Sequence, residues 1–159
     1  MKILFFILAL SGNFAFSQCN YNTNERPDGN IIKYFNPKPI IRQAGYEVGS
    51  SIYYNVTTKK YYINIAVLLK TLNCNSVENT LNIQLKHSTQ SVSLALTQFN
   101  KTQMNGKDVI IALYELDVKS LNLLKKYSLK TVYFTMQSKI YGSTINENNN
   151  LLINELKCI

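Results

Sequence analysis

The chain contains few of the residues that enzymes most often use for chemistry. Among its 159 residues are one histidine, three cysteines and nine acidic side chains. The cysteines and His87 show neither the Cys-x-x-Cys nor the His-x-x-x-His spacing that brings metal ligands together. A catalytic cysteine would need a nearby base, and His87 falls in an expected turn. The sequence therefore predicts no metal site, no cofactor and no catalytic residues.

Acidic pairs suited to hydrolysis are equally scarce. Glycoside hydrolases use two carboxyl groups, and the candidates here are scattered along the chain: Glu47, Glu78, Asp108, Glu115 and Asp117. Asp117 is better explained as a helix cap, and Glu115 as an outward residue of a strand. We therefore interpret the chain as a non-enzyme. A hydrolase acting on an envelope polymer is the alternative.

Basic residues outnumber acidic ones, 17 to nine, and give a formal net charge of +8. They are dispersed, because Lys59-Lys60 and Lys125-Lys126 are the only basic pairs. Nucleic-acid and heparin sites usually show runs of five or more basic residues. The charge pattern therefore predicts a solvated basic surface and no nucleic-acid partner.

The only long apolar run is at the N-terminus. Residues 1–17 combine Lys2, an apolar run from Ile3 to Leu10, and small residues at Ala15 and Ser17, where a signal peptidase reads. A spanning helix needs about 20 apolar residues, which exceeds this run. We predict a signal peptide over 1–17 and one β-rich domain over 18–159. The mature chain is then expected, without a transmembrane helix, in the periplasm or outside the cell. A retained anchor and acylation at Cys19 are the alternatives.

Export would place the three cysteines in an oxidising compartment, where they tend to pair. Cys19 and Cys158 lie next to the two ends of the mature chain, and Cys74 lies in a polar loop. We favour a Cys19–Cys158 disulfide, which would contribute about 3 to 5 kcal/mol by restricting the unfolded chain. A bond from Cys74 to either terminal cysteine, or no bond, remains open.

The stretch from Thr80 to Glu115 gives the clearest structural pattern. Apolar residues recur there at every second position in three segments: Leu81, Ile83 and Leu85; Val92, Leu94 and Leu96; Val109, Ile111 and Leu113. This spacing places one face of a strand on a core. Asn105-Gly106 predicts a tight turn between the second and third strands.

Further strands are expected at 31–35, 51–56, 60–69, 131–136 and 139–145. A helix is expected from the Asp117 cap to Lys126, and another over 147–156 with Asn146 as its cap. We predict a mainly β fold, an antiparallel sandwich or α+β arrangement with about seven or eight strands and two short helices.

Tyrosine is abundant, with eleven residues. Four of them lie on the two arms of one predicted hairpin: Tyr53, Tyr54, Tyr61 and Tyr62. Exposed tyrosines suit recognition of sugars or proteins, and we take these four as candidate binding residues. Because strands alternate, about half of them should point away from the core. Cross-strand packing within the sheet is the competing interpretation.

Both ends of the chain resemble a family of small exported Bacteroidetes proteins, which are uncharacterised. The mature chain would open Cys19-Asn20-Tyr21-Asn22-Thr23-Asn24-Glu25, matching their Cys-x-Tyr-x-x-Asn-Glu opening, and it ends Leu156-Lys157-Cys158-Ile159 as theirs do. The resemblance implies an exported β-rich domain and supplies no catalytic residues.

The sequence thus favours a binding or structural module of the periplasm or cell surface. Its partner is unknown, with a glycan or an envelope protein as the two classes considered. A eukaryotic secreted glycoprotein is a further alternative, because Asn55-Val56-Thr57 and Asn100-Lys101-Thr102 match the glycosylation tripeptide.

Overall fold

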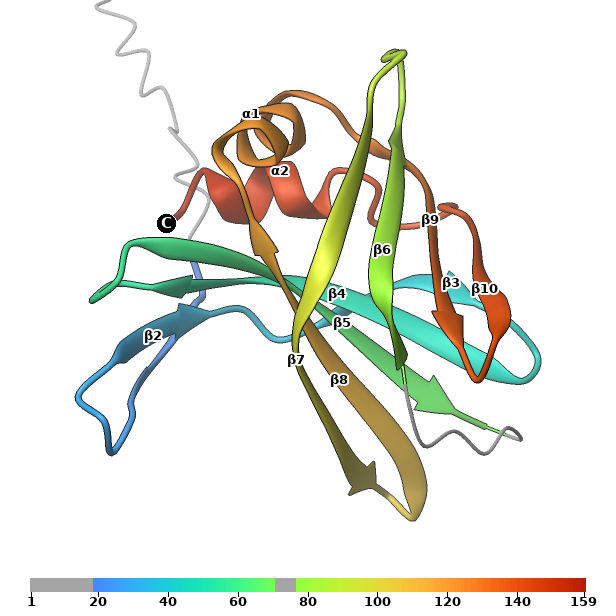
Figure 1. Ribbon diagram of the computed structural model, residues 1–159, viewed down its shortest axis with the longest axis horizontal. Helices are drawn as coiled ribbons and strands as arrows, with labels where there is room; N and C mark the ends of the chain where they lie inside the picture. Colours follow the sequence, from blue (N-terminus) through green and yellow to red (C-terminus); the bar gives the residue numbers. More distant parts are fainter. Residues whose placement is uncertain (1–18, 71–76) are drawn as a thin grey trace, which may run out of the picture.

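The computed structural model describes residues 19–70 and 77–159. These residues form ten strands and two short helices (Figure 1). The strands are β1 (Asn22–Glu25), β2 (Ile31–Tyr34), β3 (Lys38–Arg42), β4 (Tyr46–Asn55), β5 (Lys60–Leu69), β6 (Val77–Leu85), β7 (Ser91–Met104), β8 (Lys107–Leu116), β9 (Leu129–Met136) and β10 (Lys139–Thr144). The helices are α1 (Val118–Lys126) and α2 (Leu151–Leu156).

All ten strands belong to one open antiparallel sheet, in the order β1-β2-β4-β5-β8-β7-β6-β9-β10, with β3 also paired to β4. Strand β7 joins the two halves of the sheet. Its first part, from Ser91 to Ala95, pairs with β6, and its second part, from Leu96 to Met104, pairs with β8. The register shifts between Leu96 and Gln98, where the strand passes from one neighbour to the other. The two halves therefore face each other across the core.

The prediction of a mainly β, antiparallel fold with two short helices is confirmed. The predicted number of seven or eight strands is too low, because the described residues form ten strands, and these belong to one open sheet that is not a clear sandwich. The count was low because β1 is fully exposed and polar, and β3 contains Pro39. Neither segment shows the alternation of apolar residues that marks a strand in sequence.

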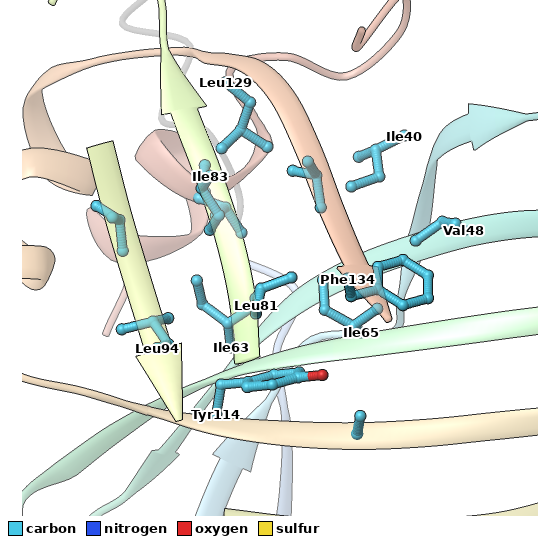
Figure 2. Packing of buried hydrophobic residues seen from close by; sticks show 14 of the residues in the cluster. Ile40, Val48, Ile63, Ile65, Leu81, Ile83, Leu94, Tyr114, Leu129 and Phe134 are labelled. Atoms are coloured by element: carbon cyan, nitrogen blue, oxygen red, sulfur yellow. The ribbon is translucent and has the colours of Figure 1, made fainter. Parts of the chain in front are cut away.

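The core lies between the two halves of the sheet. Figure 2 shows side chains of β4, β5 and β8 facing those of β6, β7 and β9, among them Val48, Ile63, Ile65, Tyr114, Leu81, Ile83, Leu94 and Phe134. Both helices lie on this same side of β4 and β5 (Figure 1). They contribute Leu124 from α1 and Leu151, Leu152 and Leu156 from α2 to the core.

Strand β8 turns the opposite face to the core from the one predicted. Ile110, Ala112 and Tyr114 are buried in the core, whereas Ile111 and Leu113 lie half-buried on the other face. Both faces of β8 are apolar because it is a central strand, between β5 and β7. The alternation in the sequence therefore could not identify the core face. The apolar side chains that were expected in the core lie on the outer face of β8 instead.

Local signals predicted the β7–β8 turn and one of the two helix caps. Asn105 and Gly106 both have left-handed backbone angles, with φ of 52° and 72°, as the predicted β7–β8 turn requires. The Asp117 side chain accepts the Ser120 N–H at 2.6 Å and caps α1, which is confirmed. Helix α2 is shorter than predicted, because it begins at Leu151 with Asn150 at its cap position in place of Asn146.

The edge strand β10 meets β4 through side chains. The Tyr46 hydroxyl accepts the Gly142 N–H at 3.2 Å, and the rings of Tyr46 and Tyr141 lie edge to face with centroids 5.4 Å apart. Gly142 has φ of 141°, and a Cβ there would lie 2.1 Å from the Val132 carbonyl oxygen. Only glycine therefore fits this close approach.

The two ends of the described chain are joined covalently. Cys19 and Cys158 form a disulfide with their Cα atoms 5.5 Å apart, which is the pairing that the sequence favoured. The predicted signal peptide and Cys74 lie outside the described residues. Within residues 19–70 and 77–159, no helix is long and apolar enough to cross a membrane.

Candidate functional site

The four candidate tyrosines are divided between the two faces of the β4–β5 hairpin. Tyr53 pairs with Tyr62 and Tyr54 with Tyr61 in the strand register. The Tyr54 and Tyr61 rings stack with centroids 4.4 Å apart, and Tyr61 packs against the core. The ammonium group of Lys125, on α1, lies 5.7 Å from the Tyr61 ring centroid. This pair is thus engaged in packing on the helix side of the sheet.

Tyr53 and Tyr62 lie on the opposite face, which the helices do not cover. The Tyr53 ring also contacts Tyr34 of β2, with centroids 5.2 Å apart. We call Tyr34, Tyr53 and Tyr62 the tyrosine row. Burial raises the pKa of the Tyr53 hydroxyl, and neighbouring Tyr34 adds to the shift. A small hollow of about 100 Å³ lies at the row, between Arg26, Tyr53, Tyr62 and Leu113.

A larger depression of about 410 Å³, the sheet hollow, lies on the same face of β4, β5, β8 and β7. Its lining residues are Pro37, Pro39, Glu47, Gly49, Ala66, Leu68, Thr102, Gln103, Met104, Val109 and Ile111. Most of these side chains are apolar, and Met104 is 54% exposed. The sheet ladder fixes their positions, since Ala66 pairs with Ile111 and Leu68 with Val109.

Charged residues border the sheet hollow. The Glu47 carboxylate accepts a hydrogen bond from the Arg42 guanidinium group at 3.1 Å and lies 3.7 Å from the Lys70 ammonium group. On the β7–β8 hairpin, Lys101 and Asp108 form an ion pair at 2.7 Å. The Lys101 ammonium and the Gln103 amide bond the Asp108 carboxylate and lower its pKa. Because side chains alternate along β8, Asp108 shares the face of Ile110, so this second ion pair lies on the opposite face of the hairpin from the hollow. The charged border of the hollow is therefore Glu47 with Arg42 and Lys70.

A third cavity, of about 570 Å³, is lined by Asn36 and Lys38, the neighbours in sequence of the Pro37 and Pro39 that line the sheet hollow. It is lined by Cys19, Asn20, Phe35, Asn36, Lys38, Asn148, Asn149, Asn150, Leu151, Asn154, Glu155 and Cys158. We call it the asparagine pocket, because six of these twelve residues are asparagine. The residues come from three separate segments of the chain, and the Cys19–Cys158 disulfide joins the first to the last.

Glu155 is the titratable residue of this pocket that the sequence analysis missed. Its side chain is buried, with the residue 4% exposed, and Oε2 accepts the Ile52 N–H at 2.7 Å. Among the described residues, Oε1 has no hydrogen-bond partner. Burial raises the pKa of Glu155 to about 7, although the Ile52 N–H and the charge of Lys38 act in the opposite direction.

A sequence signal for the burial of Glu155 did exist. It follows Leu151 by four residues and Leu152 by three, which places it on their face of a helix. Both leucines are buried. An acid on the apolar face of a short helix is unusual, and this position indicates that the Glu155 side chain is buried.

The acids considered from the sequence all have structural partners. Glu47, Asp108 and Asp117 are described above, Glu115 pairs with Lys60 at 2.9 Å, and Glu78 accepts the Ser138 N–H at 2.6 Å. His87 is exposed in the β6–β7 turn. Within the described part of the chain, no group of three or more His, Cys, Asp or Glu residues could hold a metal ion.

The two glycosylation tripeptides differ in accessibility. Asn55 is buried, and its amide donates to Asn30 at 3.2 Å while accepting the Thr58 N–H at 3.0 Å. Asn100 is exposed on β7. No protein-family model, curated protein or solved structure matches this chain.

Proposed function

We propose that this chain is an exported, non-catalytic binding module that docks a protein of the cell envelope on the uncovered face of its sheet. The observation that carries this proposal is the apolar outer face of the two central strands. Ala66 and Leu68 of β5 and Ile111 and Leu113 of β8 all lie half-buried there. A sheet face that remains in water is normally polar.

The chemistry of this face favours a protein over a glycan. Protein interfaces combine an apolar core, enriched in methionine and tyrosine, with a polar border. The sheet hollow is lined by Leu68, Ile111 and Met104, and Glu47, which pairs with Arg42, lies at its border. Sugar sites need hydrogen-bonding groups at the centre, where this surface carries hydrocarbon. The tyrosine row extends the same face and would add amphipathic contact area.

Export is supported by three observations. The Cys19–Cys158 disulfide is typical of oxidising compartments. The pattern of residues 1–17 is that of a signal peptide, and the resemblance to exported Bacteroidetes proteins points the same way. The test is fractionation of cells that produce the chain with a C-terminal tag. We expect tagged protein outside the cytoplasm, with residues 1–17 removed and the disulfide oxidised. Full-length, reduced protein in the cytoplasm would contradict export.

Docking is tested by affinity chromatography of envelope extracts on purified protein. We expect the wild type to retain a defined envelope protein, and the Leu68→Asp/Ile111→Asp variant to lose it because two charges are placed in the apolar centre. Ser93→Asp is the matched control, since Ser93 is exposed on the other half of β7. Equal retention by the double variant, once its circular dichroism matches the wild type, would contradict the proposal. Retention of polysaccharide without any protein would contradict protein docking and would indicate that the chain binds a glycan.

A further inference from the structure

The asparagine pocket is a cavity that sheet docking does not use. It shares no lining residue with the sheet hollow, and it is polar where the sheet hollow is apolar. Its volume of about 570 Å³ falls within the range of roughly 300 to 1,000 Å³ that is typical of small-molecule sites. The asparagine pocket is therefore a separate candidate site for a small ligand.

Hydrogen bonds hold several of the lining amides in place. The Asn148 amide donates to the Pro39 carbonyl at 2.7 Å, and Asn36 accepts from Asn22 at 3.2 Å. The Asn150 side chain bonds the Ser128 hydroxyl. Each of these amides keeps further donor or acceptor capacity, because an asparagine side chain offers two donors and two acceptor positions. The pocket thus presents oriented polar groups rather than a freely moving surface.

Glu155 supplies the second, independent observation. One carboxyl oxygen is satisfied by the Ile52 N–H, and the other is buried without a partner among the described residues. A buried acceptor left without a donor is costly, and a charged one especially so. The backbone carbonyl of Glu155 accepts the Cys158 N–H at 3.0 Å, so the residue is fixed next to the disulfide. Glu155 lines the pocket, and this oxygen has almost no exposed surface, so a ligand donor would reach it after the side chain turns toward the cavity and would then remove the cost.

The lining favours a neutral polyhydroxyl ligand. A hydroxyl group donates and accepts at once, and side-chain amides do the same. A cationic ligand is disfavoured because Lys38 lines the same pocket. Phe35 and Leu151 add apolar patches to the lining, which suit the C–H faces of a sugar ring.

We propose that the asparagine pocket binds a saccharide, with a ligand hydroxyl donating to Glu155 and the asparagine amides bonding its other hydroxyls. This site does not depend on docking at the sheet face. Glu155 is the only acid among the described lining residues, so the pair of carboxyl groups used in glycoside hydrolysis is incomplete there. The site is therefore a binding site.

The experiment is a titration of the purified, oxidised protein followed by NMR of its backbone amides. The probes are glucose, N-acetylglucosamine and a linear N-acetylglucosamine tetramer, with ethylammonium chloride as the cationic comparison. We expect saturable shifts at residues 148–155 and at Asn36, and none at Leu68 or Ile111. Tighter binding of the tetramer would identify a polymer chain as the ligand source, and equal binding would identify a free sugar.

Two variants and one control make the result specific. At pH 8, above the Glu155 pKa of about 7, Glu155→Gln should weaken saccharide binding by about tenfold, because a charged acceptor is lost. Asn154→Ala removes an exposed amide of the lining, so it should fold normally and weaken binding several-fold. Asn100→Ala removes an equally exposed asparagine outside the pocket and should bind as the wild type does.

Three results would overturn the proposal. One is the absence of saturable shifts with every saccharide at millimolar concentration. Another is binding of ethylammonium as tight as that of any saccharide. The third is wild-type affinity in Asn154→Ala together with wild-type affinity in Glu155→Gln, or in Asn154→Ala alone if the Glu155 variant does not fold.

Discussion

The sheet hollow and the asparagine pocket are built in different ways. The hollow rests mainly on four paired strands, and the ladder between β4, β5, β8 and β7 fixes all its lining side chains except Pro37 and Pro39. The pocket gathers Cys19, Asn20, Phe35, Asn36, Lys38 and seven residues between Asn148 and Cys158, and a disulfide with a few side-chain hydrogen bonds holds them together. The hollow should therefore persist when single contacts are removed, whereas the pocket should depend on each of its ties.

Removing the disulfide should have the largest effect on stability, and it tests whether the pocket and the hollow are held independently. The Cys19→Ser/Cys158→Ser variant should lose about 3 to 5 kcal/mol of unfolding free energy, because the unfolded chain is no longer closed into a loop. Denaturant unfolding measures the loss. Hydrogen exchange should show protection falling first in α2 and near Tyr21, with β5 and β8 still protected.

Reduction of the wild type with dithiothreitol is the control, and it should reproduce the variant's stability. Uniform loss of protection across β5, β8 and α2 would show that the two surfaces are not independently held. An unchanged free energy of unfolding would show that the bond does not close a loop that matters to stability.

The next largest effect is expected from Glu155, through pH. Its folded pKa of about 7 lies above the ordinary value of 4.5, so the folded state binds the proton more tightly than the unfolded state does. The associated stability is fully present below about pH 4.5 and is lost as the pH rises through 7. The total is roughly 3 kcal/mol at one pKa unit per 1.36 kcal/mol.

Urea unfolding of wild type and Glu155→Gln between pH 4 and 8 measures this contribution. As the pH rises, the unfolding free energy of the wild type should fall relative to that of Glu155→Gln. A difference that stays constant over this range would mean that Glu155 is not buried as a carboxyl group in solution.

Tyr114 gives a smaller effect and provides a contrast with Glu155. Its hydroxyl is buried in the core without a partner among the described residues, and burial raises its pKa. Unlike Glu155, it lines none of the three cavities described above. Tyr114→Phe should therefore raise the unfolding free energy by up to about 1 kcal/mol and leave saccharide binding unchanged. A loss of more than that amount would reveal a hydrogen bond to the hydroxyl.

The same contrast explains what the sequence could predict. Period-two patterns located β6, β7 and β8, and Asn105-Gly106 and Asp117 marked a turn and a cap, because those signals are local. The core face of β8 was not predictable, since Ile110 and Ile111 are equally apolar and only the neighbouring strands distinguish them. The asparagine pocket was missed because its residues lie more than 100 positions apart. Only the cysteine pairing connected those segments in advance.

The smallest stability effect is expected at the sheet hollow, where the binding effect should be largest. Met104 is 54% exposed at the end of β7 and makes part of the hollow's wall. Met104→Ser should change the unfolding free energy by no more than about 0.5 kcal/mol, yet weaken partner retention, because an exposed apolar side chain contributes mainly to the interface. Val118→Ser is the matched control, since Val118 is 75% exposed and lies outside the hollow. If both variants retain the partner equally well, exposed apolar area alone does not define the docking face, and the ladder-held side chains Leu68 and Ile111 must carry it instead.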